Sequence, residues 1–158
     1  MATIRQATLD DLPAISKMAE RFYPESPYPA IYGDMPEHQA AGLAIVAIRG
    51  WAEMGIEPGV MLVAEADGRL VGMLCLHVDA STFAPAVIAA ELVWWVEPEH
   101  RGGMTAVRLI KAGEQAAKER GAQVMNMSVL STSPREAGDM LGRLGYAPSQ
   151  IIHTKRLT

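Results

Sequence analysis

The stretch from residue 94 to residue 106 holds the residues with the clearest chemical potential in this 158-residue chain. An apolar segment ends there, and Arg101 is followed by Gly102 and Gly103 just before a helical pattern begins. The first N–H groups of a helix are free and lie at the positive end of the helix dipole, so they attract anions. Glycines let the backbone approach a phosphate closely. This pattern predicts a pyrophosphate site, with the organic arm of the ligand along the preceding strand.

Two common phosphate motifs do not fit this stretch. No Gly-Lys-Ser/Thr follows, as a Walker loop requires, and the G-x-G-x-x-G spacing of dinucleotide-binding folds is absent. A glycine pair before a helix is also typical of a tight turn that binds nothing. The local residues alone leave both interpretations open.

Glu91 is the candidate for acid–base chemistry, because it interrupts the apolar segment 87–96. A carboxylate in such a strand is expected either half buried, with a raised pKa, or at a sheet face that opens on a cleft. The alternative is a structural glutamate paired with an arginine such as Arg69.

No metal site is expected. The four histidines show no metal-ligand spacing, and they are His38, His77, His100 and His153. Cys75 is the only cysteine, so no intrachain disulfide is possible, and a reducing compartment fits. We expect Cys75 to be a buried core thiol.

Length and composition favour one folded domain over residues 1–158. Hydrophobic residues make up 49% of the chain, which argues against disorder. A formal charge of −4 gives no electrostatic reason to expect nucleic acid as a partner. The sequence has no apolar run of about 20 residues and no apolar segment at its start, so we expect no membrane partner and a cytoplasmic location.

The elements that position these residues follow from local patterns. We expect a strand at 3–7, then a helix from a Thr8–Asp11 capping box to about residue 22. Four prolines predict irregular structure over 23–36, and a helix follows at 37–54. Asp67-Gly68 between two apolar runs predicts a hairpin of strands 60–66 and 69–76, and a further strand spans 87–96.

The second half alternates between helices and strands. An apolar stripe predicts a helix over 104–120, and Gly121 is its expected C-cap. A buried strand at 123–130, a helix at 134–144 and a last strand at 151–157 complete the chain. This order predicts a mixed α/β fold whose first part is an antiparallel sheet.

The loop at 101–106 resembles motif A of the GNAT N-acetyltransferases, [Q/R]-x-x-G-x-[G/A], which cradles the pyrophosphate of CoA. Arg101 falls on its first position and Ala106 on its last, while Met104 stands where the family usually has glycine. The order of elements is similar over nearly the whole chain. Stretch 91–103 looks closest to GNAT proteins of phages and their bacterial hosts. Other matching residues are Val96, Pro98 and Glu99 before the loop, Ala137, and Leu144-Gly145-Tyr146.

The resemblance implies a single-domain acyl-CoA N-acyltransferase fold, with a mixed, mostly antiparallel sheet and helices on both faces. It implies acetyl-CoA as cosubstrate, no metal, and direct transfer of acetyl to a primary amine of a small molecule or protein. In the family, backbone groups at the end of the fourth strand bind pantetheine, and the loop binds the phosphates. Carried over, the cofactor-binding residues are Trp95, Val96, Arg101, Gly102, Gly103, Met104, Thr105 and Ala106.

The resemblance also assigns catalytic roles. Glu91 matches the strand glutamate that serves as base in several GNAT enzymes. The tyrosine that usually acts as acid is replaced by Leu141, and an upstream asparagine is replaced by Pro134. Ser131 or Ser133 is an alternative proton donor. Three tyrosines lie where the family builds its acceptor wall, namely Tyr23, Tyr28 and Tyr32.

Two other functions remain open from the sequence. Leu141 and Met104 are also compatible with an acyl-CoA-binding module that has little or no turnover. A structural interaction domain with no ligand is the third interpretation. The sequence leaves the acceptor and the oligomeric state open, and a homodimer is one option for a fold with an exposed sheet edge.

Overall fold

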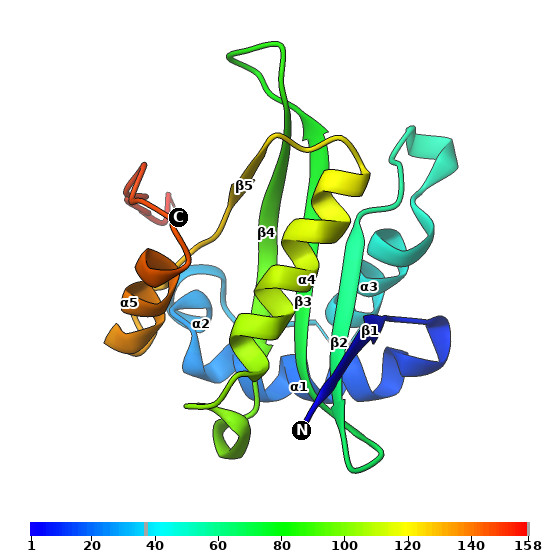
Figure 1. The fold of residues 1–158 in the computed structure, drawn as a ribbon, viewed down its shortest axis with the longest axis vertical. Helices are drawn as coiled ribbons and strands as arrows, with labels where there is room; N and C mark the ends of the chain where they lie inside the picture. Colours follow the sequence, from blue (N-terminus) through cyan, green and yellow to red (C-terminus); the bar gives the residue numbers. More distant parts are fainter. Residues whose placement is uncertain (37, 158) are drawn as a thin grey trace.

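The computed structural model describes residues 1–36 and 38–157, and its centre is a five-stranded sheet of order β1-β2-β3-β4-β5. Helix α4 covers one face of this sheet, and α1 and α3 cover the other (Figure 1). Two apolar cores result, one on each side of the sheet. The predicted fold class, a mixed and mostly antiparallel sheet between helices, is confirmed.

The antiparallel part consists of β1 (Thr3–Gln6), β2 (Val60–Ala66), β3 (Arg69–Ala80) and β4 (Val87–Val96). Asp67 and Gly68 join β2 to β3 with φ values of 51° and 71°. Both values lie in the left-handed region that a two-residue hairpin turn requires, so the predicted hairpin is confirmed. The fifth strand, β5 (Val124–Asn126), runs parallel to β4.

Helix α4 (Thr105–Glu119) packs on the sheet through the predicted apolar stripe. Leu109 and Ile110 are buried, and Gly113 faces Leu74 of β3. A Cβ added at Gly113 would lie 2.5 Å from Leu74 Cδ2, so any other residue there requires Leu74 or the helix to shift. The C-cap of the helix is Arg120, and Gly121, the predicted C-cap, follows it at φ 82° and turns the chain.

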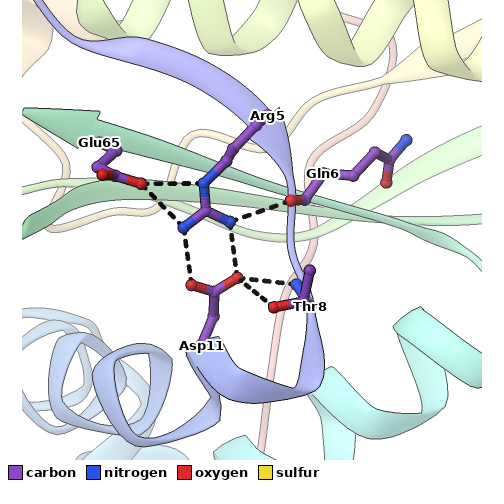
Figure 2. A network of polar contacts seen from close by, with 5 residues as sticks. All are labelled: Arg5, Gln6, Thr8, Asp11 and Glu65. Carbon is purple, nitrogen blue, oxygen red and sulfur yellow. Dashed lines mark hydrogen bonds and ion pairs between the residues drawn. The ribbon is translucent and has the colours of Figure 1, made fainter. Parts of the chain in front are cut away.

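The opposite face is covered by α1 (Leu12–Glu25), preceded by the 3₁₀ turn η1 (Leu9–Asp11), and by α3 (Gln39–Arg49). The predicted capping box is present, since Asp11 Oδ2 accepts the Thr8 backbone N–H at 2.8 Å. Arg5 donates from Nη1 to Asp11 Oδ2 at 2.8 Å and from Nε to Glu65 Oε2 at 2.9 Å (Figure 2). The Arg5 hydrogen bond lowers the pKa of Asp11 to about 2. This network fixes the corner between β1, β2 and the start of α1.

The prediction of irregular structure over 23–36 was wrong in part. Helix α1 continues to Glu25 through Pro24, and a short helix α2 (Tyr28–Tyr32) follows. Proline is compatible with the first turn of a helix, where N–H groups have no partner, so Pro27 and Pro29 suit the start of α2.

The helix expected over 37–54 is shorter. Helix α3 ends at Arg49, because Gly50 has a φ of 71° and turns the chain. The 3₁₀ turn η2 (Ala52–Met54) follows separately. Glu37, the expected first residue, lies outside the described residues.

Two strand predictions near the C-terminus were wrong. The strand expected at 123–130 is only the three residues of β5, and Val124 in it is exposed. Helix α5 (Arg135–Arg143) forms as predicted, but residues 151–157 are exposed and have no regular structure. Strand propensity produces a strand only where the segment pairs with a neighbouring strand, and residues 151–157 pair with none among the described residues.

Within the described ranges, no helix has both the length and the apolar character that a bilayer span requires.

Candidate active site at the fork between β4 and β5

Strands β4 and β5 are paired only over three residues, from Ile88–Val124 to Ala90–Asn126. Beyond Ala90 they separate, and the chain after β5 runs toward α5 (Figure 1). A cavity of about 540 Å³ opens at this fork, a volume in the range of small-molecule sites. Its walls come from α1, β4, the start of α4, the segment after β5, and α5.

A β-bulge in β4 lies at the fork. Cys75 of β3 is opposite Val93, whereas the next residue, Leu76, is opposite Glu91, so Leu92 is the extra residue. A bulge bends its strand and changes the direction of neighbouring side chains. It lies directly beside Glu91, which lines the cavity.

The environment of Glu91 differs from that of a surface carboxylate. Its Oε2 accepts the Ser128 backbone N–H at 3.2 Å. Burial raises the pKa of Glu91 to about 7, although the hydrogen bond from Ser128 acts in the opposite direction. Arg69, the alternative partner, lies at the far end of β3 beside Ala66. The pKa of Glu91 therefore lies near neutrality, a value that suits proton transfer.

The loop after β4 leaves backbone donors free. The 3₁₀ turn η3 (Pro98–His100) leads to Gly102, whose φ is 77°, and α4 then begins at Thr105 without a side-chain cap. A Cβ built at Gly102 or Gly103 would meet no atom within 4 Å, so the space in front of this loop is open. The start of α4 therefore has the features of an anion site.

The Arg101 side chain turns back over the end of β4. Its Nε donates to the Val96 carbonyl at 2.8 Å, and its guanidinium carbon lies 4.2 Å from the centre of the Trp95 ring. A longer ion pair of 3.4 Å joins it to Glu25. The Val96 carbonyl, one of the backbone groups expected to bind a ligand, is thus already hydrogen-bonded to the Arg101 side chain.

Trp95 contributes a polar group that has no partner. Its ring is buried and packs edge to face on Phe22, at 5.6 Å between ring centres. Among the described residues, nothing accepts a hydrogen bond from its Nε1. A buried donor of this kind is rare in folded proteins, and a bound ligand is one group that satisfies it.

Helix α1 is held against this site by an ion pair between the half-exposed Arg21 and the buried Glu97. Arg21 Nε donates to Glu97 Oε1 at 3.0 Å, and Glu97 directly follows β4. The pair fixes the C-terminal end of α1, which places Glu25, Ser26 and Tyr28 on the cavity wall.

A family model for the acetyltransferase (GNAT) family matches residues 13–146, which is most of the chain. The chain belongs to the GNAT acetyltransferase family. This confirms the resemblance seen in the 101–106 loop and identifies the protein as an acyltransferase.

Several solved structures of similar length share the fold of this chain. The BH1408 protein of Bacillus halodurans, crystallised as a mutant, superposes with a TM-score of 0.81 at 15% identity, covering 99% of both chains. Ribosomal-protein-alanine N-acetyltransferase of Brucella melitensis has a TM-score of 0.73 at 17% identity, with full coverage of both chains. Glucosamine-6-phosphate N-acetyltransferase of Arabidopsis thaliana has a TM-score of 0.72 at 11% identity, covering 100% of this chain and 99% of that one. No curated protein is similar enough to this sequence to count as a match.

In this GNAT chain, the cavity brings together nearly all the residues that the sequence singled out. Its walls do not include Thr105, the first residue of α4. Met104, which replaces the usual glycine, is largely exposed at the cavity. The predicted residues that line it are Glu91, Trp95, Val96, Arg101, Gly102, Gly103, Met104 and Ala106.

Of the three tyrosines and Leu141, which the sequence analysis also named, only one residue lines the cavity. Tyr28 lines the cavity, whereas Tyr23 donates to the Gly33 carbonyl at 2.7 Å and Tyr32 is exposed. Leu141 is buried in α5, away from the cavity wall. The Tyr146 hydroxyl donates to Glu114 of α4 at 3.0 Å, and burial raises its pKa well above the usual range.

The two serines proposed as proton donors also differ. Ser133 lines the cavity, and its Oγ accepts the Leu130 backbone N–H at 3.1 Å. Ser131 is not part of the wall.

Sequence reasoning named Ser133 in the segment after β5 but missed Ser128. Ser128 contributes its N–H to Glu91 and its carbonyl to Trp94 Nε1, at 3.0 Å. Met140 and Arg143 of α5 complete the wall. A backbone N–H has no sequence signature, because every residue except proline has one. Only the approach of the two chain segments identifies Ser128.

Proposed function

We propose that this GNAT protein transfers the acetyl group of acetyl-CoA to a primary amine of a small molecule or protein, by direct attack of the amine. The observation that supports this best is one cavity containing both Glu91, with its pKa near 7, and the uncapped start of α4. The first suits proton removal from an amine, and the second suits a phosphate.

The residues of this site fit acetyl-CoA. When bound, acetyl-CoA supplies the acetyl group as an activated thioester. The pyrophosphate would be held by free N–H groups between Gly102 and Ala106, and the pantetheine arm would lie along Trp95 and Val96. The orphaned Trp95 N–H supplies a donor for this arm. The Val96 carbonyl becomes available only if the Arg101 side chain moves away from it.

Glu91 would act on the acceptor. An alkyl amine with a pKa of about 10.4 is neutral in only about one molecule in a thousand at pH 7. A carboxylate at the fork can accept the proton that the amine loses, a role worth roughly 10²–10⁴ in rate. With a pKa of about 7, Glu91 is about half ionised at neutral pH.

The leaving group needs no tyrosine acid in this proposal. Leu141 has no proton to donate, and it lies outside the cavity wall. A thiol with a reference pKa of about 8.5 is an acceptable leaving group on its own. The neighbouring structures act, by their names, on a ribosomal protein and on a sugar phosphate, so the fold by itself does not set the acceptor.

The test is a panel of small amines and amino-terminal peptides incubated with acetyl-CoA, with the released thiol measured. We expect thiol release that depends on the amine and exceeds slow hydrolysis. Tight CoA binding without amine-dependent thiol release across the panel would reject the proposal. That result would favour the alternative, an acyl-CoA-binding module with little or no turnover.

A further inference from the structure

A second cavity, of about 210 Å³, lies beside the first. It lies between the α1–α3 layer and the sheet, with Ala40 and Ala44 of α3 on one side and Met61 and Met73 on the other. Phe22 and Tyr28 line both cavities, and their rings meet edge to face at 6.1 Å. These two rings form the boundary between the cavities.

The two cavities differ in charge. The first is lined by ionisable side chains, including Glu25, Glu91 and Arg101. The second has no acidic or basic side chain among the described residues of its wall. Its Tyr23 hydroxyl is bonded to a backbone carbonyl, and burial raises the pKa of the Cys75 thiol to about 12, so that thiol stays neutral.

The second cavity is large enough for a sizeable apolar group. An engineered apolar cavity of about 150 Å³ binds benzene, so about 210 Å³ accommodates an aryl ring or a branched alkyl group. Met35, Met61 and Met73 line it. Methionine side chains are flexible and polarisable, so they adapt to such groups.

Glu91 lies at the first cavity, next in sequence to residues that line the second. It lines the first, and the next two residues of β4, Leu92 and Val93, line the second. Its charge also contributes to the raised pKa of Tyr28 and of Cys75, both on the second wall, although burial is the larger cause for each. An amine nitrogen bound at Glu91 is therefore close enough to the second cavity for a short carbon chain on that amine to reach it.

We propose that the second cavity binds the apolar arm of the acceptor, so that the preferred acceptor is a primary amine bearing an aryl or branched alkyl group. This inference rests on the proposed acetyl transfer and adds the acceptor class. The amine lies beside Glu91 in the first cavity, and its apolar arm passes Phe22 and Tyr28 into the second.

A pair of amines that differ only in the arm tests this in solution. Phenethylamine should have a kcat/KM at least about tenfold above that of ethylamine, since apolar groups in such pockets are worth about tenfold or more. Ala40→Phe should fill the second cavity and bring the ratio of the two kcat/KM values, phenethylamine to ethylamine, near one. Ala41→Phe is the matched control on the same helix, since Ala41 lines neither cavity, and it should keep the wild-type ratio.

A second measurement needs no turnover. With ¹³C-methyl methionine, phenethylamine should shift the resonances of Met35, Met61 and Met73, identified by Met→Leu substitution, and ethylamine should not. A missing shift overturns the inference, and so does an equal rate for the two amines. Shifts without acetylation of any amine would support the cavity's ligand class while rejecting the proposed transfer. If Ala40→Phe does not fold, the rates and the methionine shifts of the wild-type protein with the two amines still test the inference.

Discussion

At the scale of single residues, the chemistry of Glu91 depends on burial. A glutamate on a surface is fully ionised at neutral pH, whereas the fork raises the pKa of this one to about 7. The Ser128 N–H holds the carboxylate in place without neutralising it. Burial thus gives one strand residue a proton affinity suited to its proposed role.

Glu91→Gln keeps the side-chain size and removes the base. At pH 7, with an amine that the enzyme accepts, we expect kcat/KM to fall by roughly 10² or more, while CoA affinity measured by calorimetry stays nearly unchanged. The deficit should shrink at pH 9.5, because neutral amine is then abundant. An equal deficit at both pH values would contradict proton abstraction.

The pH profile of the wild-type enzyme provides a separate test. Burial raises the pKa of Glu91, so the carboxylate is protonated below pH 7 and ionised above it. Calculated per total amine, kcat/KM should rise through about pH 7 and then level off while the amine remains mostly protonated. Glu91→Gln should show no inflection near pH 7 and should instead follow the fraction of neutral amine, and a wild-type profile without the inflection would assign the base elsewhere.

We predict that none of the four tyrosines acts as the general acid. Tyr28 alone of the four lines the main cavity, while the Tyr146 hydroxyl is engaged with Glu114. We expect that changing Tyr23, Tyr28, Tyr32 or Tyr146 to phenylalanine, one at a time, leaves the alkaline limb of kcat in place. If one substitution removes about a hundredfold of kcat together with that limb, a tyrosine acid exists.

At the scale of elements, α4 contributes to the site through its N-terminus and to the fold through one face. The loop before Thr105 is open toward the cavity, whereas the stripe around Gly113 is in close contact with β3. Substitutions at the two places should therefore have separable effects.

Gly103→Glu tests the loop. A side chain there meets no atom of the protein within 4 Å, so the fold should tolerate it, but the carboxylate adds bulk and negative charge where phosphates are proposed. Calorimetry should show CoA affinity reduced at least about tenfold, or about 1.4 kcal/mol. Gly138→Glu in α5, equally open and outside the cavity wall, is the control and should bind CoA as wild type does. Equal affinities for the two variants would place the phosphates elsewhere.

Gly113→Ala tests the packing face. The new methyl would lie 2.5 Å from Leu74 Cδ2, so α4 or Leu74 must shift, at a cost of about 1–3 kcal/mol. Gly138→Ala meets nothing within 4 Å and should instead stabilise by a few tenths to about 1 kcal/mol, through helix propensity. Urea unfolding measures both, and the order of the two stabilities is the decisive result.

At the scale of the whole molecule, ligand binding and stability are linked. A ligand that binds only the folded state at 100 times its Kd adds about 2.7 kcal/mol, which for a chain of this size is about 5–10 °C in Tm. We therefore expect CoA to raise the melting temperature by that amount, and Gly103→Glu to reduce the rise to about half or less, because a tenfold weaker affinity leaves about 1.4 kcal/mol. A Tm insensitive to CoA would support the structural interaction domain that the sequence left open.

The sequence by itself determined the features that depend on a few neighbouring residues. Asp67-Gly68 specified a turn with two positive φ values, the apolar stripe specified α4, and Gly102-Gly103 before that helix specified a loop with open space in front of it. The family resemblance of the 101–106 loop follows from the same local pattern, and the family match confirms it.

Only the tertiary structure decided the features that need distant partners. The strand expected at 151–157 pairs with no strand of the described chain, so its propensity has no effect. The fork after Ala90 brings Ser128 to Glu91 across 37 positions of sequence, and the bulge at Leu92 arises from pairing with β3. Sequence patterns encode local backbone preference and amphipathicity, whereas burial and pairing are properties of two segments at once. The pKa of Glu91 and the two adjoining cavities belong to this second kind.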